Sequence, residues 1–218
     1  MITNEDNMTL MARYPDKYFD LAIVDPPYGI GIAKTTHYQS KNKNKITVYQ
    51  EKKWDNEAPT ESYWNELFRV SKNQIVWGGN YFTDYLKPTK DWIVWDKNQP
   101  QDMHFAMGEL AWCSFGRGLR IFYRSIAKDQ NRVSNNKEKA QAYKRIHPTQ
   151  KPVKLYEWLL MNYAKEGDKI LDTHLGSGSI AIACHNLGFE LTACELDKDY
   201  YEAALKRIEQ HKLQQRLF

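Results

Sequence analysis

The sequence has few cysteines, no long apolar run and no cluster of metal-binding side chains. Its three cysteines, Cys113, Cys184 and Cys194, lie far apart without a Cys-x-x-Cys pair, which predicts reduced and mostly buried thiols. No apolar run approaches the roughly 20 residues that a membrane-spanning helix needs, and the polar start is not a signal peptide. We therefore expect a cytoplasmic protein without a metal site. The 218 residues fit one α/β domain, 1–218, with insertions.

The net charge is only +4, but positive charge is concentrated in two segments. Residues 31–53 carry six lysines against one glutamate, and residues 116–146 carry nine basic side chains against two acidic ones. The two segments therefore have net charges of +5 and +7, which leaves the rest of the chain at −8. This segregation suits a surface that binds a polyanion, although two solvated lysine-rich loops would give the same pattern.

An apolar, β-branched run ends abruptly on an acid, two prolines and an aromatic residue. Residues 19–24 predict a buried strand. Because neither Pro26 nor Pro27 can donate a backbone hydrogen bond, this strand must end in a rigid extended turn. Asp25 and Tyr28 are then held at the carboxyl end of a strand, which is the edge where open α/β sheets bind ligands. An ordinary strand end followed by a Pro-Pro turn is the alternative.

The remaining pattern predicts strands and helices in alternation, separated by two long loops. Further strands are expected at residues 1–4, 74–77, 91–96, 109–115, 169–173 and 189–195, of which the third and fourth form a hairpin pair. Helices are expected at residues 7–14, 61–70, 153–163 and 180–187, and a last one, capped by Asp197, reaches about residue 214. The two basic stretches have no sustained period, so we expect them to be loops.

A glycine loop follows the expected strand at residues 169–173. Residues 176–181 satisfy the pattern G-x-G-x-x-A between a strand and a helix, and Glu195 ends the next strand about 20 residues later. Small residues let a ligand approach the backbone, and a carboxylate in this place can accept hydrogen bonds from ribose hydroxyls. Taken alone, the pattern indicates a dinucleotide-binding fold. A tight strand-to-helix turn with a chance acid is the alternative.

Three motifs together resemble a known family. Asp25-Pro26-Pro27-Tyr28 resembles the catalytic tetrapeptide of amino-group DNA methyltransferases, residues 171–179 resemble their S-adenosylmethionine loop, and residues 147–152 resemble the cofactor motif that precedes it. The catalytic strand comes first, a basic insert next and the cofactor loop last, which is the circularly permuted order of the β group. Thr173-His174 stand where the family usually has Pro-Phe.

The resemblance implies a Rossmann-like methyltransferase fold. Such a fold has a mixed, mostly parallel, seven-stranded sheet with helices on both faces. The strands that precede Asp25 and Gly176 should then be adjacent, so that the two motifs meet across one cleft.

The resemblance also implies methyl transfer from S-adenosylmethionine to the exocyclic N6 of a flipped adenine in DNA. The lone pair of this amine is delocalised into the ring. Hydrogen bonds from its two N–H groups to the Asp25 carboxylate and the Pro26 carbonyl would free the lone pair for attack. Tyr28 would stack on the base, and Pro27 completes the expected catalytic set. The sequence has no Pro-Cys pair, which argues against cytosine carbon-5 methylation.

A cofactor site is implied by the same resemblance. Asp172 is expected to face the methionine amino group, Glu195 the ribose and Asp6 the adenine, with a simple helix N-cap as an equal alternative for Asp6. The other expected cofactor residues are Asp25, His147, Thr149, Gln150, Lys151, His174, Gly176, Ser177, Gly178 and Ser179.

Target recognition is expected in residues 31–58 and 116–146, where basic side chains can reach phosphates or base edges. The candidate DNA contacts are Lys34, Lys41, Lys43, Lys45, Arg117, Arg120, Arg124 and Arg132. Because these segments are short for a recognition domain, we expect a short target sequence or a homodimer.

Four alternatives stay open for the function: cytosine-N4 methylation, RNA adenine methylation, an NAD-dependent oxidoreductase, and a nucleic-acid-binding module without activity.

Overall fold

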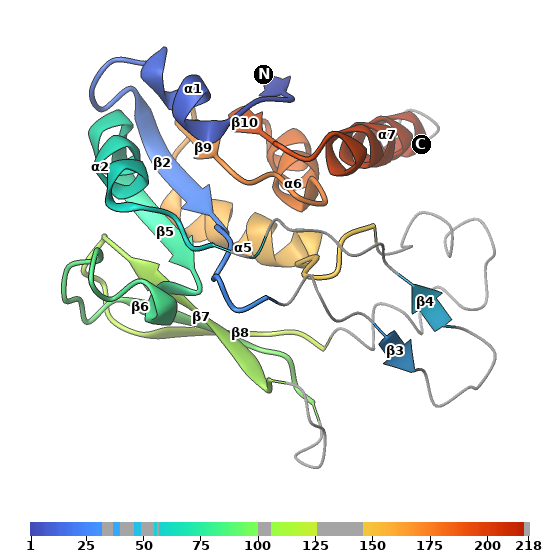
Figure 1. Ribbon diagram of the computed structural model, residues 1–218, viewed down its shortest axis with the longest axis horizontal. Coiled ribbons are helices and arrows are strands. Elements are labelled where there is room, and N and C mark those ends of the chain that lie inside the picture. Colours follow the sequence, from blue (N-terminus) through green and yellow to red (C-terminus); the bar gives the residue numbers. More distant parts are fainter. Residues whose placement is uncertain are drawn as a thin grey trace.

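One large sheet organises the molecule (Figure 1). The structure is a computed structural model that describes residues 1–31, 37–39, 46–48, 55, 57–99, 106–125 and 146–215. In these ranges the strands of the large sheet are β1 (Ile2–Thr3), β2 (Phe19–Val24), β5 (Ser71–Trp77), β6 (Trp92–Asp96), β7 (Gly108–Cys113), β8 (Arg120–Tyr123), β9 (Lys169–Asp172) and β10 (Glu190–Cys194). The helices are α1 (Asn7–Ala12), α2 (Glu61–Val70), α5 (Val153–Tyr163), α6 (Ser179–Leu187), α7 (Lys198–Gln215) and the short 3-10 helix η2 (Gly79–Tyr81).

The strand order of this sheet is β1-β10-β9-β2-β5-β7-β6-β8. Within it β7 runs antiparallel to both of its neighbours, β5 and β6, and the other pairings are parallel. The mixed, mostly parallel sheet with helices on both faces is therefore confirmed. All seven expected strands are present, and β6 and β7 pair as predicted.

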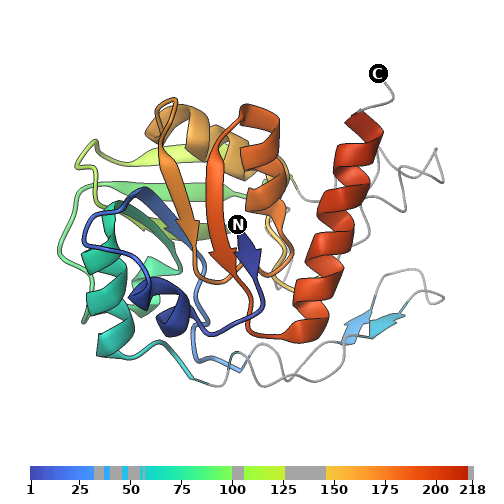
Figure 2. The ribbon, with the colours of Figure 1, turned by 90° about the horizontal axis from the view of Figure 1, so that it is seen from above.

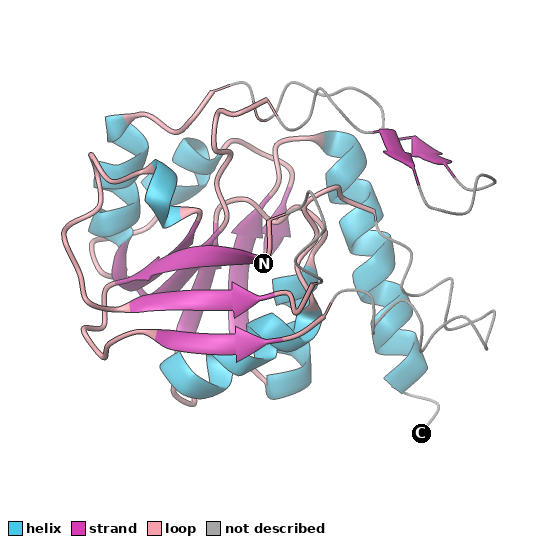
Figure 3. Cartoon of the chain, turned by 90° about the horizontal axis from the view of Figure 1, so that it is seen from below, coloured by secondary structure: helices cyan, strands magenta, loops and turns pink. Residues whose placement is uncertain are grey.

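The expectation of two long loops is wrong in two places. The large sheet has eight strands instead of the expected seven, because β8 lies inside the second basic stretch and pairs with β6 at the edge of the sheet. Strand β3 (His37–Gln39) and strand β4 (Ile46–Val48) lie inside the first basic stretch and pair as a separate two-stranded sheet (Figure 3). These three strands are only three or four residues long, so none of them shows the alternation by which longer strands are recognised.

Helices cover both faces of the sheet, as Figure 2 shows from above. Successive residues of a strand point to opposite faces. On β2, Leu21 and Ile23 join the cluster that packs against α5, α6 and α7, whereas Ala22 and Val24 join the cluster that packs against α1 and α2. Because β2 is buried from both sides, its residues 21–24 form a continuous apolar run.

The central strands bring the two predicted motifs together. β2 pairs with β9 in parallel, with Leu21 opposite Ile170 and Ala22 opposite Leu171. Both strands therefore end at the same edge, and the residues that follow them, Asp25 after β2 and the glycine loop after β9, emerge side by side. This adjacency is the arrangement expected from the family resemblance.

All three cysteines of the chain are free and buried. Burial raises the pKa of Cys184 to about 12, and it also raises the pKa values of Cys113 and Cys194. These thiols therefore stay protonated at neutral pH. Across the described ranges no helix is long and apolar enough to cross a membrane.

Candidate active site

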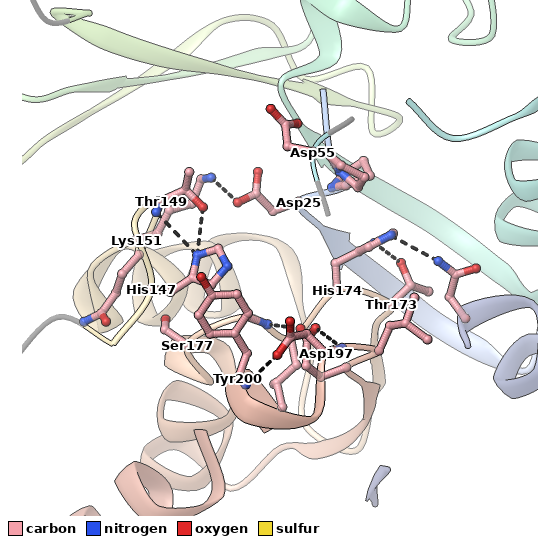
Figure 4. A pocket seen from close by; sticks show the side chains of 18 of the residues that line it. Asp25, Asp55, His147, Thr149, Lys151, Thr173, His174, Ser177, Asp197 and Tyr200 are labelled. Atoms are coloured by element: carbon pink, nitrogen blue, oxygen red, sulfur yellow. Dashed lines mark hydrogen bonds and ion pairs between the residues drawn. The ribbon is translucent and has the colours of Figure 1, made fainter. Parts of the chain in front are cut away.

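A cavity of about 520 Å³ opens where the carboxyl ends of β2 and β9 meet. Ligand sites in proteins commonly have volumes of about 300–1,000 Å³. Its lining includes residues 25–28 from the end of β2, the loop residues Gly176 and Ser177, and Glu195 after β10. Figure 4 shows Asp25 and Lys151 pointing toward each other across part of this cavity. The two predicted motifs therefore share one cavity.

Asp25 is held on both oxygens by neighbouring side chains. Its Oδ2 lies 2.5 Å from Nζ of Lys151, and its Oδ1 accepts a hydrogen bond from the Tyr28 hydroxyl at 2.8 Å. Burial raises the pKa of Asp25, and the Lys151 ammonium offsets part of this effect. Burial by itself would lower the pKa of Lys151, but Asp25 and Glu109 outweigh it and the pKa is raised. Lys151 is therefore a permanent cation beside the carboxylate.

The turn after β2 is fixed by groups that the sequence analysis did not identify. Asp55 is buried, and its Oδ1 accepts hydrogen bonds from the backbone N–H groups of Tyr28 and Gly29 at 2.7 and 3.1 Å. The Tyr28 ring stacks on Tyr81, with the ring centroids 4.8 Å apart and the planes inclined by 16°. Asp55 and Tyr81 gave no signal in sequence because neither belongs to a motif.

Gly78 makes room for the Tyr28 ring. It follows β5 in a left-handed conformation with φ of +66°, and a Cβ atom built on it would lie 2.2 Å from Cε1 of Tyr28. A side chain at this position would therefore overlap the ring. The glycine turn after β5 helps to place the aromatic residue of the first motif.

The glycine loop contacts the cavity with its first half. Gly176 and Ser177 line the cavity, whereas Gly178 packs against Ile208 of α7, and Ser179 donates a hydrogen bond to the Lys151 carbonyl at 2.7 Å. Gly178 and Ser179 therefore fix the loop through contacts outside the cavity. These two expected cofactor residues therefore lie behind the cavity lining.

Glu195 contacts the backbone around it as well as the cavity. Its Oε2 accepts a hydrogen bond from the Gly176 N–H at 2.8 Å, and its Oε1 accepts one from the Asp197 N–H at 2.9 Å. Burial raises the pKa of Glu195, and these backbone donors offset part of the effect. The Glu195 carboxylate therefore lies in the cavity wall, and its expected contact with a ribose stays a prediction.

The segment from His147 to Lys151 forms another wall of the cavity. His147, Thr149, Gln150 and Lys151 all line it. The Thr149 hydroxyl lies 3.0 Å from Nδ1 of His147, and the His147 ring packs on Tyr200 with centroids 4.4 Å apart. Burial, together with the nearby Lys151, lowers the pKa of His147 to about 3, so this imidazole is neutral.

Asp172 and His174 are placed differently from each other. Asp172 is buried below the cavity lining, where its Oδ1 accepts a hydrogen bond from the His174 N–H at 3.0 Å and burial raises its pKa to about 8. The His174 ring lines the cavity, and burial lowers its pKa to about 3. Its Nδ1 lies 2.9 Å from the Thr173 hydroxyl, and its Nε2 lies 3.1 Å from the Asn7 amide nitrogen. A polar chain thus stands where the family pattern has Pro-Phe.

Asp6 caps a helix, and its expected contact with the adenine of the cofactor stays a prediction. Its Oδ1 caps α1 by accepting hydrogen bonds from the Met8 and Thr9 N–H groups at 2.8 and 3.2 Å, and the residue also lines the cavity. Its carboxylate therefore caps α1 and places an exposed polar group at the cavity edge.

Three of the eight candidate DNA contacts lie in the part of the chain that the structure describes. Arg117 donates a hydrogen bond to the Asn162 carbonyl at 2.6 Å, and its guanidinium lies 5.1 Å from the ring centroids of Phe115 and Tyr163. Arg120 begins β8, and Arg124 follows this strand. Outside the described residues lie Lys34, Lys41, Lys43, Lys45 and Arg132.

Comparison with known proteins places the chain in a family. A family model described as DNA methylase, of the N6 and N4 amino-methylating type, matches residues 34–206. The chain belongs to this family of DNA methylases. The family membership leaves the oxidoreductase interpretation without support, because the residues that the family model matches include the glycine pattern at 176–181.

Two curated relatives match most of the chain. The type II methyltransferase M.HpaI of Haemophilus parainfluenzae is 24% identical over 223 residues, which cover 87% of this chain and 68% of that protein. The type II methyltransferase M2.DpnII of Streptococcus pneumoniae is 24% identical over 253 residues, which cover 96% of this chain and 89% of that protein.

Solved structures share the fold. A complex of M1.HpyAVI with S-adenosylmethionine matches with a TM-score of 0.62 at 20% identity, covering 95% of this chain and 98% of that one. The PvuII methyltransferase, described as cytosine-N4-specific, matches with a TM-score of 0.60 at 12% identity, covering 97% of this chain and 89% of that one. The methyltransferase fold that the family resemblance implied is confirmed.

Proposed function

We propose that this DNA methylase transfers a methyl group from S-adenosylmethionine to the N6 amine of adenine in DNA. The observation that carries the proposal is the shared cavity, in which the Asp25 carboxylate and the glycine loop that precedes α6 meet. The cavity also fits the donor. Carboxylates at Glu195 and Asp6 suit hydroxyl and amine donors, and the loop backbone at Gly176 is open to the cavity.

The bound donor would supply an electrophilic methyl group on a positively charged sulfur. The residues of this chain prepare the amine that attacks it. Asp25 and the Pro26 carbonyl accept hydrogen bonds from the two N–H groups of the amine. These bonds draw the nitrogen toward tetrahedral geometry and make its lone pair available. The new N–C bond forms as the S–C bond breaks, and the surplus proton leaves the product amine for solvent.

Tyr28 keeps the carboxylate in place while its ring offers a stacking surface. The hydroxyl holds Oδ1 of Asp25 at 2.8 Å. A flipped base that stacks on Tyr28 regains part of the stacking energy that it loses on leaving the duplex, a cost of a few kcal/mol. Adenine is favoured over cytosine because the tetrapeptide begins with Asp25, whereas cytosine-N4 enzymes of the family more often have serine there.

The test is incubation of the purified protein with radiolabelled S-adenosylmethionine and unmethylated DNA, followed by digestion and identification of the labelled nucleoside. We expect N6-methyladenine. Label on cytosine would move the assignment to N4 chemistry, and transfer to RNA but not to DNA would move it to an RNA substrate. Absence of transfer to any nucleic acid would contradict the proposal.

The role of Asp25 is tested by Asp25→Ala. Removing a group that stabilises the reacting nitrogen should lower kcat by about 10²- to 10³-fold, with donor binding retained in calorimetry. Asp20→Ala is the matched control, because Asp20 lies at the opposite end of β2 and pairs with the exposed Lys72. An Asp25→Ala variant as active as the control would refute the mechanism.

A further inference from the structure

Asp25 is connected to a row of charged side chains that reaches across the sheet. Lys151 Nζ lies 2.5 Å from Oδ2 of Asp25 and 3.1 Å from Oε2 of Glu109, and Lys97 Nζ lies 2.8 Å from Oε1 of Glu109. The order along the row is therefore Asp25, Lys151, Glu109, Lys97. Its members come from the end of β2, the segment before α5, strand β7 and the residue after β6.

Lys151 is the buried centre of this row. Its side chain is only 2% exposed, and its ammonium lies 5.2 Å from the ring centroid of Trp77. A buried ammonium has to be compensated, and here two carboxylates share it. The backbone of Lys151 is also fixed, because its carbonyl accepts the hydrogen bond of Ser179. Lys151 therefore has little freedom to turn toward another partner.

Glu109 can act on Asp25 through the shared ammonium. If Lys151 were paired with Asp25 alone, its full positive charge would act on that carboxylate. Asp25 would then be a weaker hydrogen-bond acceptor for the target amine. Glu109 shares the Lys151 ammonium with Asp25 and so weakens its effect on Asp25. Lys97 forms an ion pair with the other carboxylate oxygen of Glu109. No motif includes Glu109, and nothing in the family pattern assigned it a role here.

We propose that Glu109 is a positioning residue for methyl transfer, which acts through Lys151 to set the orientation and acceptor strength of the Asp25 carboxylate. This inference rests on the proposed function, because it takes Asp25 as the group that contacts the target amine. It also gives Lys151, expected among the cofactor residues, a role beside the catalytic carboxylate.

The charged and titratable groups around Asp25 fix the sign of the expected pH effects. Lys151 favours its ionised form, Glu109 opposes it by repulsion, and the Tyr28 hydroxyl favours it by donating a hydrogen bond. Deeper in the site, Tyr156 and Asp172 also interact electrostatically with Asp25. Methyl transfer needs ionised Asp25, so its rate falls as pH drops through the Asp25 pKa.

The acidic limb of the pH–rate profile is the range in which the rate falls as pH drops. Two variants should shift this limb in opposite directions. Glu109→Gln keeps the side-chain shape but removes a negative charge, which shifts the limb to lower pH by about one unit and lowers kcat by about 10- to 100-fold. Lys151→Met removes the cation and shifts the limb to higher pH by about one unit or more. The KM for S-adenosylmethionine should stay within about twofold in Glu109→Gln.

The double variant distinguishes positioning from a structural effect. Lys151→Met leaves two carboxylates facing each other, so adding Glu109→Gln removes the repulsion and should return the limb toward its wild-type position. Lys72→Met is the control, because it breaks a Lys–Asp pair of 2.6 Å at the opposite end of β2. If Lys151→Met fails to fold, the direction of the Glu109→Gln shift decides alone.

A readout without DNA separates this proposal from the proposed function. The ¹³Cγ signal of Asp25, assigned by its loss in Asp25→Asn, gives the titration of the carboxyl group directly. We expect it to titrate at lower pH in Glu109→Gln and at higher pH in Lys151→Met. Shifts in the same direction, or shifts no larger than in Lys72→Met, would overturn the proposal. A wild-type protein that fails to methylate DNA but shows the opposite shifts would refute the function and leave the coupling standing.

Discussion

Gly78→Ala offers a quantitative test of how the site is held together. The residue has φ of +66°, and its added Cβ would lie 2.2, 2.5 and 2.8 Å from three atoms of the Tyr28 ring. A left-handed conformation costs an alanine about 1–2 kcal/mol, and overpacking costs about 1–3 kcal/mol. We therefore expect the free energy of unfolding to fall by about 2–5 kcal/mol.

Gly188→Ala is the matched control for the backbone cost. Gly188 ends α6 with φ of +76°, and a Cβ there would have no atom within 4 Å. This variant should lose only the conformational cost of about 1–2 kcal/mol. Urea denaturation of both variants then isolates the overlap with Tyr28 as the difference between them.

The two variants should also differ in activity. The Tyr28 ring has to turn away from an alanine at position 78, which breaks its 2.8 Å hydrogen bond to Asp25 and its stack on Tyr81. Misplacement of the reacting groups should then lower kcat by about 10- to 100-fold in Gly78→Ala and leave Gly188→Ala near wild type. Equal stability and equal activity of the two variants would refute the argument that Gly78 places Tyr28.

Two further predictions concern the buried groups below the cavity. Burial raises the pKa of Asp172 from 3.8 to about 8, so the folded protein binds this proton more tightly than the unfolded chain does, and stability falls as pH rises between these values. Asp172→Asn should remove this fall in urea denaturation at pH 5 and 8, and an unchanged slope would contradict the assignment. Tyr63→Phe removes the buried 2.8 Å contact with the Thr173 hydroxyl and should cost about 1–2 kcal/mol. Thr173→Val should add less in the Tyr63→Phe background than alone, and full additivity would argue against a shared hydrogen bond.

Most of the sheet could be predicted because its central strands and helices follow simple patterns. The strand at residues 19–24 and the helix at residues 61–70 have the predicted bounds. In both, apolar side chains face a buried layer, so periodicity and burial agree. β8 was missed because it is a short edge strand whose residues are mostly exposed.

The motif residues of the site could be predicted, but the contacts between motifs could not. Asp25, Gly176 and Glu195 line one cavity because each follows a strand of the same parallel set. Glu109 reaches Lys151 only because β7 pairs with β5, and no local pattern in the sequence specifies this pairing. Asp55 likewise caps the Tyr28 turn from a distant segment.

Because its three thiols are buried, the native chain should react only slowly with thiol-labelling reagents. Thiol reagents attack the thiolate, and none of the cysteines is exposed or ionised at neutral pH. A single cysteine introduced at Leu196, which is 71% exposed and borders the cavity, would therefore carry the reactive group. An environment-sensitive dye attached there would report ligand entry in real time, and reaction of the native thiols would measure how often the core opens.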